Sequence, residues 1–254
     1  MNRSKDVGRT PGSLRSRRQS RFHTRKRPFV VATFAITVDG KVTTKNFGPV
    51  DFTSREDKLH LFRQRASADA VLIGHTSLER DNVRLGLPAD LQELRTKHGQ
   101  SRSPMRVIIS NKGRIDERLK IFQSDLSPII IFSTKRMSQK TQKALQTKAT
   151  LHLTDAKHVN LAVMLETLRN QYKIGTLACE GGPTLFRALL EEDLIDQLNL
   201  TIAPHMFGGA TAPTLTGVST EFLPASVHCS LIDMRTIGDE CFLTYRIKHH
   251  RRRN

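Results

Sequence analysis

The sequence has no tryptophan, only two tyrosines and only three cysteines among 254 residues. Because aromatic side chains for base stacking are so few, the composition argues against a single-stranded nucleic-acid binder. Cys179, Cys229 and Cys241 show no C-x-x-C spacing, which argues against a zinc site and against a disulfide scaffold. Cys179 and Cys241 lie in apolar runs, so we expect them to be small buried residues in a reducing compartment.

Long apolar runs and several well-known motifs are also missing. No window approaches about 18 consecutive apolar residues, so no membrane span is expected, and the charged N-terminus lacks the apolar segment of a secretory signal. The absence of H-x-E with P-C-x-x-C, G-x-S-x-G and H-E-x-x-H argues against zinc deaminases, serine hydrolases and zinc proteases. The Rossmann G-x-G-x-x-G and the P-loop are absent as well. We expect no metal ion.

Positive charge is concentrated at the two ends of the chain. The formal net charge is +17, from 41 Lys and Arg against 24 Asp and Glu. Residues 1–27 carry ten Lys or Arg against one acid, a net +9, and residues 248–254 carry four more. Residues 28–247 therefore hold only +4, so we do not expect nucleic acid to be a partner of this protein.

We divide the chain into a leader (1–27), a body (28–247) and a tail (248–254). The leader is rich in Arg and Ser and poor in apolar residues, a composition typical of disorder. It can be interpreted as a polyanion-binding arm, as an Arg/Ser-rich transit peptide, or as a solvated segment without a specific role. We expect a cytoplasmic protein, or an organellar one if the leader is a transit peptide.

The body alternates strand-like and helix-like patterns. The continuous apolar run 29–36 indicates a strand buried on both faces, and shorter runs predict strands at 70–73, 105–110, 128–132, 177–180 and 198–203. Helical spacing predicts helices after Ser54, between Asn160 and Gln171, and from 184 to 192 with Leu185, Leu189 and Leu190 toward the core. Residues 229–247 read as a hairpin, and 90–103 as a surface excursion. The pattern predicts an α/β sandwich with a mostly parallel sheet and an antiparallel C-terminal hairpin.

The run Glu180-Gly181-Gly182-Pro183-Thr184-Leu185 is the most informative motif. An apolar strand ends in a carboxylate, two glycines turn the backbone, and a proline opens a helix. A helix N-terminus reached through Gly-Gly can hold an anion, because its free N–H groups and its dipole both favour negative charge. The motif therefore predicts a site for a phosphorylated cofactor, with Glu180 at its rim.

Two further motifs follow predicted strands, at the sheet edge where α/β proteins bind ligands. Asp39-Gly40 comes after the first strand and, taken alone, is an ordinary turn. After the 70–73 strand, Thr76 or Ser77 is expected to cap a short helix, and Asp81 lies four residues after Ser77 on the same face. Asp81 is thus a candidate to accept a hydrogen bond from a ribose hydroxyl, with a solvated acid as the alternative.

Taken in order, five motifs resemble the reductase domain of riboflavin biosynthesis, which has a dihydrofolate-reductase-like fold. They are Thr37-Val38-Asp39-Gly40-Lys41, Phe52-Thr53-Ser54, Gln64-Arg65-Ala66 followed by 69–74, Glu180-Gly181-Gly182-Pro183, and Ile202-Ala203-Pro204 with Gly208-Gly209. The resemblance covers nearly the whole body and implies a three-layer sandwich. It also implies a stand-alone reductase, because no zinc deaminase signature precedes the body.

The resemblance assigns roles to individual residues. It implies that NADPH is held by Ala35, Ser77, Asp81, Gly181, Gly182, Pro183, Thr184 and Leu185. It implies substrate contacts at Arg65, Leu85 and Glu180, with Arg65 on the substrate phosphate, a group that suits its planar fork of donors. Pro88 stands where this family has a second substrate arginine, so Arg84 is the nearby candidate. Glu180 and Asp39 are the candidate catalytic residues, either orienting or protonating the substrate.

The activity that follows from the resemblance is NADPH-dependent reduction of a ribosylaminopyrimidine 5′-phosphate to its ribityl form. The resemblance also suggests a homodimer built through sheet edges. Two alternatives remain: another reductase of the dihydrofolate-reductase-like fold, and a basic nucleic-acid-binding protein. The second is disfavoured by the nearly neutral body.

Overall fold

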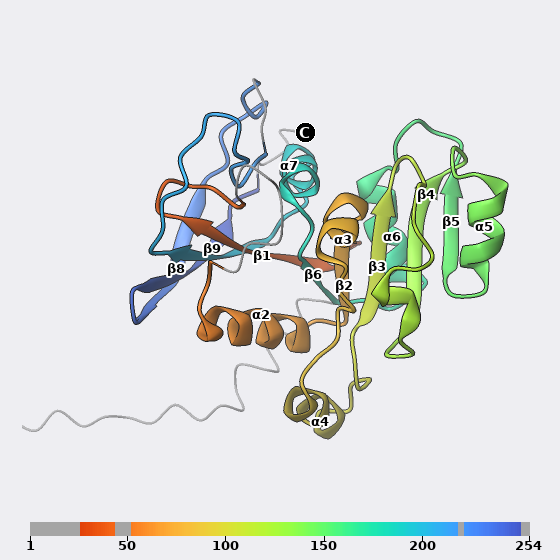
Figure 1. Cartoon of the computed structure of the whole chain (residues 1–254), viewed down its shortest axis with the longest axis horizontal. Helices are drawn as coiled ribbons and strands as arrows, with labels where there is room; N and C mark the ends of the chain where they lie inside the picture. The colour runs from red at the N-terminus through yellow and green to blue at the C-terminus, as the bar shows by residue number, and fades with distance from the viewer. Residues whose placement is uncertain (1–25, 44–51, 218–220, 250–254) are drawn as a thin grey trace, which may run out of the picture.

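The computed structural model describes residues 26–43, 52–217 and 221–249. Its helices and strands alternate along the chain as the sequence pattern predicts (Figure 1). In chain order they are β1 (Phe29–Thr37), α2 (Arg55–Ser67), β2 (Ala70–Gly74), α3 (His75–Asp81), α4 (Ala89–Lys97), β3 (Met105–Ser110), the short 3₁₀ helix η1 (Lys120–Gln123), β4 (Ile129–Thr134), α5 (Gln139–Gln146), β5 (Thr150–Thr154), α6 (Leu161–Asn170), β6 (Thr176–Cys179), α7 (Pro183–Glu191), β7 (Gln197–Ala203), β8 (Cys229–Ile237) and β9 (Glu240–Ile247).

A single nine-stranded sheet runs through the described part of the molecule. Its strand order is β5-β4-β3-β2-β6-β1-β7-β9-β8. The strands from β5 to β7 pair in parallel, whereas β9 is antiparallel to both β7 and β8. The predicted fold class, a mostly parallel sheet with an antiparallel C-terminal hairpin, is confirmed.

Helices cover both faces of the sheet, so the molecule has three layers (Figure 1). One core cluster contains buried residues of α6 and α7, including Leu165 and Phe186, and the other contains buried residues of α3 and α5, including Leu78 and Leu145. Along β6, Leu177 and Cys179 belong to the first cluster and Ala178 to the second, as the two-residue period of a strand requires. Among the described residues, no helix combines the length and apolar character needed to cross a membrane.

The predicted strands and the N-cap of α2 are confirmed. Ser54 caps α2 by accepting hydrogen bonds from the backbone N–H groups of Glu56 and Asp57. Ser54 also donates through its own N–H and hydroxyl to the Glu240 carboxylate, a contact that ties the start of α2 to β9. This long-range contact helps to fix α2 across the sheet.

Several local expectations are wrong. The segment 90–103 is not simply a surface loop, because it contains most of helix α4. The buried Arg95 of this helix donates hydrogen bonds to backbone carbonyls at the end of α2. On α7 the expected stripe does face the core, with Leu189 buried and Leu185 and Leu190 packed against it, but the buried Phe186 was not predicted. Helix α5 and strand β5 were not predicted at all, because their apolar residues are too few for a clear period.

The cysteines fall into three environments. Cys179 is fully buried, as expected, and burial raises the pKa of its thiol to about 12. Cys241 is only half-buried, and Cys229 is exposed. The thiol nearest to the glycine motif is therefore chemically quiet.

Candidate active site

The glycine turn at the end of β6 lies against the first turn of α3. Gly182 is the N-cap of α7 and Pro183 takes its first position, as predicted. A Cβ atom on Gly182 would overlap with the Ser77 hydroxyl, and one on Gly181 would overlap with the Leu185 side chain. A larger residue at either position would force the Ser77 or Leu185 side chain, or the turn itself, to move. The free N–H groups at the start of α7 make the turn suitable for a phosphate.

Helix α3 begins in a different way from the one expected. Its N-cap is Gly74, which makes no side-chain hydrogen bond, and the helix starts at His75. The expectation that Thr76 or Ser77 caps this helix is wrong, because both lie inside its first turn. The Ser77 hydroxyl lies over the glycine turn of α7 instead. Ser77 and the exposed Asp81 share one face of α3, so both remain placed for a ligand at the junction of the two helices.

Arg65 and Glu180, which are 115 residues apart in sequence, form a two-pronged ion pair. Arg65 Nε donates to Glu180 Oε1 at 2.6 Å, and Nη2 donates to Oε2 at 2.7 Å. Arg65 Nη1 donates to the carbonyl of Gly86 at 3.2 Å, and the guanidinium lies over the Phe62 ring at 5.4 Å. The two side chains are only 9% and 8% exposed, so the pair is nearly dry. Three of the five guanidinium N–H groups are thereby used, which leaves two for a ligand.

The orientation of Glu180 follows from the strand that precedes it. Glu180 comes two residues after Ala178, which faces the second core cluster, so its side chain points to the same face of the sheet. Helix α2 crosses this face and brings Arg65 in its last turn. The partnership therefore depends on how α2 crosses the sheet, which no local sequence pattern encodes.

Asp39 lies in the turn after β1 and holds the loop that follows β7. It accepts hydrogen bonds from the Thr37 hydroxyl, from Phe207 N at 3.2 Å and from Gly208 N at 2.7 Å. The Thr37 hydroxyl, followed by the backbone N–H groups of Gly208 and Phe207, holds the pKa of Asp39 below its usual range. Thr37 was part of the predicted motif 37–41 but was given no role there, and the structure shows that it positions Asp39.

The two candidate catalytic carboxylates lie at different points along β1. The register pairs Ala32 with Cys179, so Glu180 lies beside Thr33, whereas Asp39 comes after the last residue of β1, Thr37. The four residue steps from Thr33 to Thr37 span about 13 Å of strand. The two carboxylates can therefore contact different parts of one elongated ligand, but not the same atom.

The remaining predicted residues differ in how a ligand could reach them. Leu85 is 2% exposed with a φ of 56°, and its side chain belongs to the second core cluster, so a ligand could reach only its backbone. Arg84, beside it, is exposed, and so is Thr184 on α7. Ala35 is half-buried on β1.

A separate surface cavity of about 620 Å³ borders the outer side of α7. It is lined by Arg187 of α7 and by loop residues that include Thr214, Gly217 and Phe222. None of the sequence-predicted site residues lines it, although Gly217 lies close to Pro183. Over residues 26–43, 52–217 and 221–249, no group of three His, Cys, Asp or Glu side chains could hold a metal ion.

The three-layer arrangement and the mostly parallel sheet with its antiparallel C-terminal hairpin define a domain of the dihydrofolate-reductase-like class. Within that class the particular family is clear, because residues 28–243 match the family described as the RibD C-terminal domain. The chain belongs to this family.

Named relatives and solved structures are consistent with that assignment. The chain is 27% identical, over 87% of its length and 98% of the relative's, to the 2,5-diamino-6-ribosylamino-4(3H)-pyrimidinone 5′-phosphate reductase of Archaeoglobus fulgidus. It is 26% identical to the protein of the same name from Methanothermobacter thermautotrophicus, covering 87% of this chain and 99% of that one. A pyrimidine reductase-like protein from Corynebacterium diphtheriae shares the fold, with a TM-score of 0.77 at 21% identity, covering 88% of this chain and 93% of that one.

Proposed function

We propose that this protein is an NADPH-dependent reductase that converts the ribosyl group of a ribosylaminopyrimidine 5′-phosphate into a ribityl group. The main support is the juxtaposition of the α7 glycine turn with the buried Arg65–Glu180 pair. The names of the relatives that match along almost the whole body point to the same reaction.

The glycine turn fits a dinucleotide. Because Gly181 and Gly182 carry no side chain, α3 and the start of α7 pack closely, and the N–H groups at this helix start can hold a phosphate. In the proposal the pyrophosphate lies on the α7 N-terminus, from Gly181 to Leu185, and Ser77, Asp81 and Ala35 complete the site. The bound cofactor supplies the hydride.

The protein's own residues position the opened sugar. Arg65 keeps two N–H groups that can bind the substrate phosphate while its other donors hold Glu180 and Gly86. Exposed Arg84 is the candidate for a second phosphate contact. Anchoring the phosphate away from the reacting carbon would position that carbon and so lower the barrier.

Both carboxylates are better suited to orient the substrate than to protonate it. Glu180 is paired with a guanidinium, and the pKa of Asp39 is lowered by the Thr37 hydroxyl and two backbone N–H groups. An ionised carboxylate only accepts hydrogen bonds, which suits the hydroxyls of a ribose chain. In the proposal Glu180 binds one end of that chain and Asp39 binds a group farther along β1.

The decisive experiment measures NADPH oxidation by the purified full-length protein. The substrates to compare are the aminated ribosylaminopyrimidine phosphate, its deaminated form and dihydrofolate. We expect turnover with one of the two pyrimidines and none with dihydrofolate. Turnover of dihydrofolate alone would support the alternative reductase, and failure to bind any nicotinamide nucleotide in calorimetry would overturn the proposal. Comparing NADPH with NADH in the same titration tests the choice of cofactor.

The proposal includes a homodimer formed through the β8 edge. Strand β8 closes one end of the sheet order and has exposed apolar side chains, with Leu231 51% and Met234 63% exposed. Exposed apolar edge strands tend to pair with another chain. Sedimentation should show a dimer that Leu231→Glu with Met234→Glu converts to a monomer, whereas Val163→Glu on α6 should leave it intact. A monomeric parent protein would contradict this part of the proposal.

The location of the protein is also part of the proposal. We favour the cytoplasm, with an organelle as the alternative reading of the Arg/Ser-rich leader, most of which lies outside the described residues. A fluorescent fusion to the full chain, compared with a fusion that lacks residues 1–25, distinguishes the two. Organelle staining that depends on the leader would favour the transit peptide.

A further inference from the structure

Two covered polar atoms near the Arg65–Glu180 pair lack a hydrogen-bond partner within the described part of the chain. They are the hydroxyl oxygen of Thr33 on β1 and the side-chain nitrogen of Asn199 on β7. Asn199 is 1% exposed and Thr33 is half-buried, yet neither of these two atoms reaches solvent. A buried polar atom without a partner destabilises the folded state, so two of them beside the candidate site need an explanation.

The strand register places both residues in line with Glu180. Thr33 pairs with Asn199 between β1 and β7, and the register of β6 with β1 continues to put Glu180 beside Thr33. The residue before each of the three belongs to the first core cluster, so the three side chains point to the opposite face, which α2 crosses. Adjacent strands lie about 4.8 Å apart, so the three side chains form one continuous polar row.

The polar groups of this row are complementary. Gln197 Nε2 donates to Asn199 Oδ1 at 3.0 Å, so the carbonyl end of the Asn199 amide is occupied and its NH2 end is left as a donor. A threonine hydroxyl can donate one hydrogen bond and accept two. Rotation of the side chains therefore allows Asn199 to donate to Thr33 while the Thr33 hydroxyl donates to Glu180.

Glu180 gains from another donor once a substrate phosphate is bound. Both of its carboxylate oxygens are held by Arg65, through Nε and Nη2. A phosphate on the two remaining N–H groups of Arg65 brings a second anion to the same guanidinium. Because like charges repel and one cation then serves two anions, Glu180 is held less firmly unless a further donor reaches it. The Thr33 hydroxyl is the adjacent donor on the sheet.

We propose that Asn199, Thr33 and Glu180 form a hydrogen-bond relay when a phosphorylated substrate occupies Arg65. Asn199 donates to Thr33, and Thr33 donates to the Glu180 carboxylate, which keeps that carboxylate in place for the sugar. Thr33 and Asn199 are positioning residues, because they act through Glu180. Hydrogen bonds of this kind often tighten only in the complex. The relay rests on the proposed function, because it takes the substrate phosphate to bind Arg65.

The test compares full-length proteins that lack or keep the Thr33 hydroxyl. Thr33→Val removes the hydroxyl at nearly the same shape, and Thr33→Ser keeps it. Thr176→Val, at the other end of β6 and also half-buried, is the matched control. Each protein is measured by calorimetry with ribose 5-phosphate and by thermal unfolding without it. Turnover of the two ribosylaminopyrimidine phosphates is measured in parallel.

We expect Thr33→Val to raise the Kd for ribose 5-phosphate about tenfold, the scale of one lost hydrogen bond to a charged group. Its unfolding midpoint without ligand should equal or exceed that of the parent protein, because a covered hydroxyl without a partner is removed. Thr33→Ser and Thr176→Val should bind ribose 5-phosphate as the parent does.

Two double variants test whether the effect passes along the relay. Asn199→Leu should weaken ribose 5-phosphate binding in the parent protein but add nothing to Thr33→Val. Thr33→Val should in turn add nothing to Glu180→Gln, because the acceptor of its hydroxyl is already changed. Fully additive losses in either pair would overturn the relay.

The remaining outcomes separate the relay from the proposed function. The relay is overturned if the parent protein does not bind ribose 5-phosphate, or if Thr33→Val binds it equally well. A lower unfolding midpoint of Thr33→Val without ligand would show a structural role instead and would overturn it too. If Thr33→Val weakens ribose 5-phosphate binding but the parent protein reduces neither pyrimidine, the relay is supported and the proposed function fails.

Discussion

Two buried carboxylates, Glu180 and Asp196, each bind an arginine from a distant part of the chain, yet they have different surroundings. Glu180 lies at the carboxyl end of the interior strand β6, beside two glycines, and its arginine keeps two N–H groups that can bind a ligand. Asp196 is enclosed by Arg27, His249 and the Val30 N–H. A buried ion pair is therefore not evidence of a functional site by itself. Whether such a pair can form part of a binding site depends on the N–H donors it leaves unused and on the space beside it.

The largest expected effect is on turnover, from Glu180→Gln. This change keeps the shape of the side chain but removes the charge that holds Arg65. We expect kcat/KM for the pyrimidine substrate to fall about 100-fold, the scale typical of a reacting group misplaced by about 1 Å. Calorimetry should still detect nicotinamide nucleotide binding, because the backbone N–H groups of the glycine turn before α7 are unchanged. Unchanged kcat/KM would mean that Glu180 is only structural.

The matched change at the other carboxylate, Asp196→Asn, should affect stability instead. Removing the charge leaves Arg27 and His249 without their partner, and we expect a loss of about 3 kcal/mol in the free energy of unfolding. Thermal and denaturant unfolding measure the loss. At a temperature where the variant remains folded, kcat/KM should equal that of the parent protein. A large fall in turnover there would show that the two carboxylates are not functionally distinct.

A smaller effect tests whether the glycine turn at Gly181 and Gly182 is needed for NADPH binding near Glu180. In Gly182→Ala the new methyl group meets the Ser77 hydroxyl, so the Ser77 side chain must rotate away or the α7 turn must shift. We expect the Kd for NADPH to rise about tenfold, equivalent to about 1.4 kcal/mol.

The control for this change is a double-mutant cycle with Ser77→Ala, which removes the clashing hydroxyl. If the clash is the cause, the double variant should bind NADPH about as well as Ser77→Ala alone. Purely additive losses would contradict the steric explanation.

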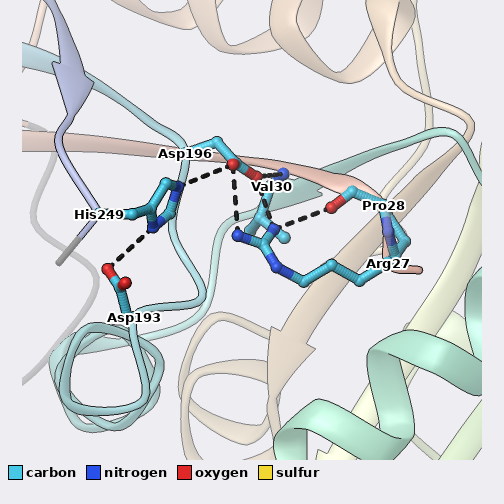
Figure 2. A network of polar contacts seen from close by, with 6 residues as sticks. All are labelled: Arg27, Pro28, Val30, Asp193, Asp196 and His249. Atoms are coloured by element: carbon cyan, nitrogen blue, oxygen red, sulfur yellow. Dashed lines mark hydrogen bonds and ion pairs between the residues drawn. The ribbon is translucent and has the colours of Figure 1, made fainter. Parts of the chain in front are cut away.

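The smallest effect is a pH dependence of stability at the contacts that Asp196 makes with Arg27 and His249 (Figure 2). Hydrogen bonding to Asp196, and then to Asp193, raises the pKa of His249, and burial opposes the shift. The stabilisation is therefore full below the ordinary histidine pKa and is lost as pH rises through the raised pKa of the folded protein. The lowered pKa of Asp196 acts at the other end of the scale, where stability is lost only in strong acid.

Unfolding midpoints measured from pH 5 to pH 9 provide the check. The groups that face His249 are Asp193 and Asp196, with Arg27 on the far side of Asp196. We expect the midpoint to fall above neutral pH in the parent protein and to lose most of this dependence in His249→Gln. A midpoint that rises through this range would contradict the sign of the argument.

Sequence reasoning worked best where a pattern is local. The apolar run of β1, the Ser54 cap and the Gly-Gly-Pro start of α7 are confirmed, because each depends on neighbouring residues. The pattern failed for α5 and β5, whose apolar faces are narrow. Those elements are held by contact with the rest of the sheet rather than by their own periodicity.

The candidate site was predicted in parts but not as an arrangement. Both Arg65 and Glu180 were identified as substrate residues, yet their pairing was not foreseen. Asp196 was overlooked, although a carboxylate next to Leu194, Ile195 and Leu198 was a usable signal of a buried ion pair. Its partners could not be found from the sequence, because they lie at the two ends of the body.

By itself the sequence determined the alternation of elements, the family and the positions of the glycine turn before α7 and of the basic ends. Those features depend on composition and on residues within a few positions of one another. Only the tertiary structure decided that Arg65 meets Glu180, that Asp39 lies farther along β1, and that the two basic ends join the fold at Asp196. The physical reason is that a buried charge needs a partner of opposite sign. Which residue becomes that partner depends on how the chain crosses the sheet, and local sequence patterns do not determine this.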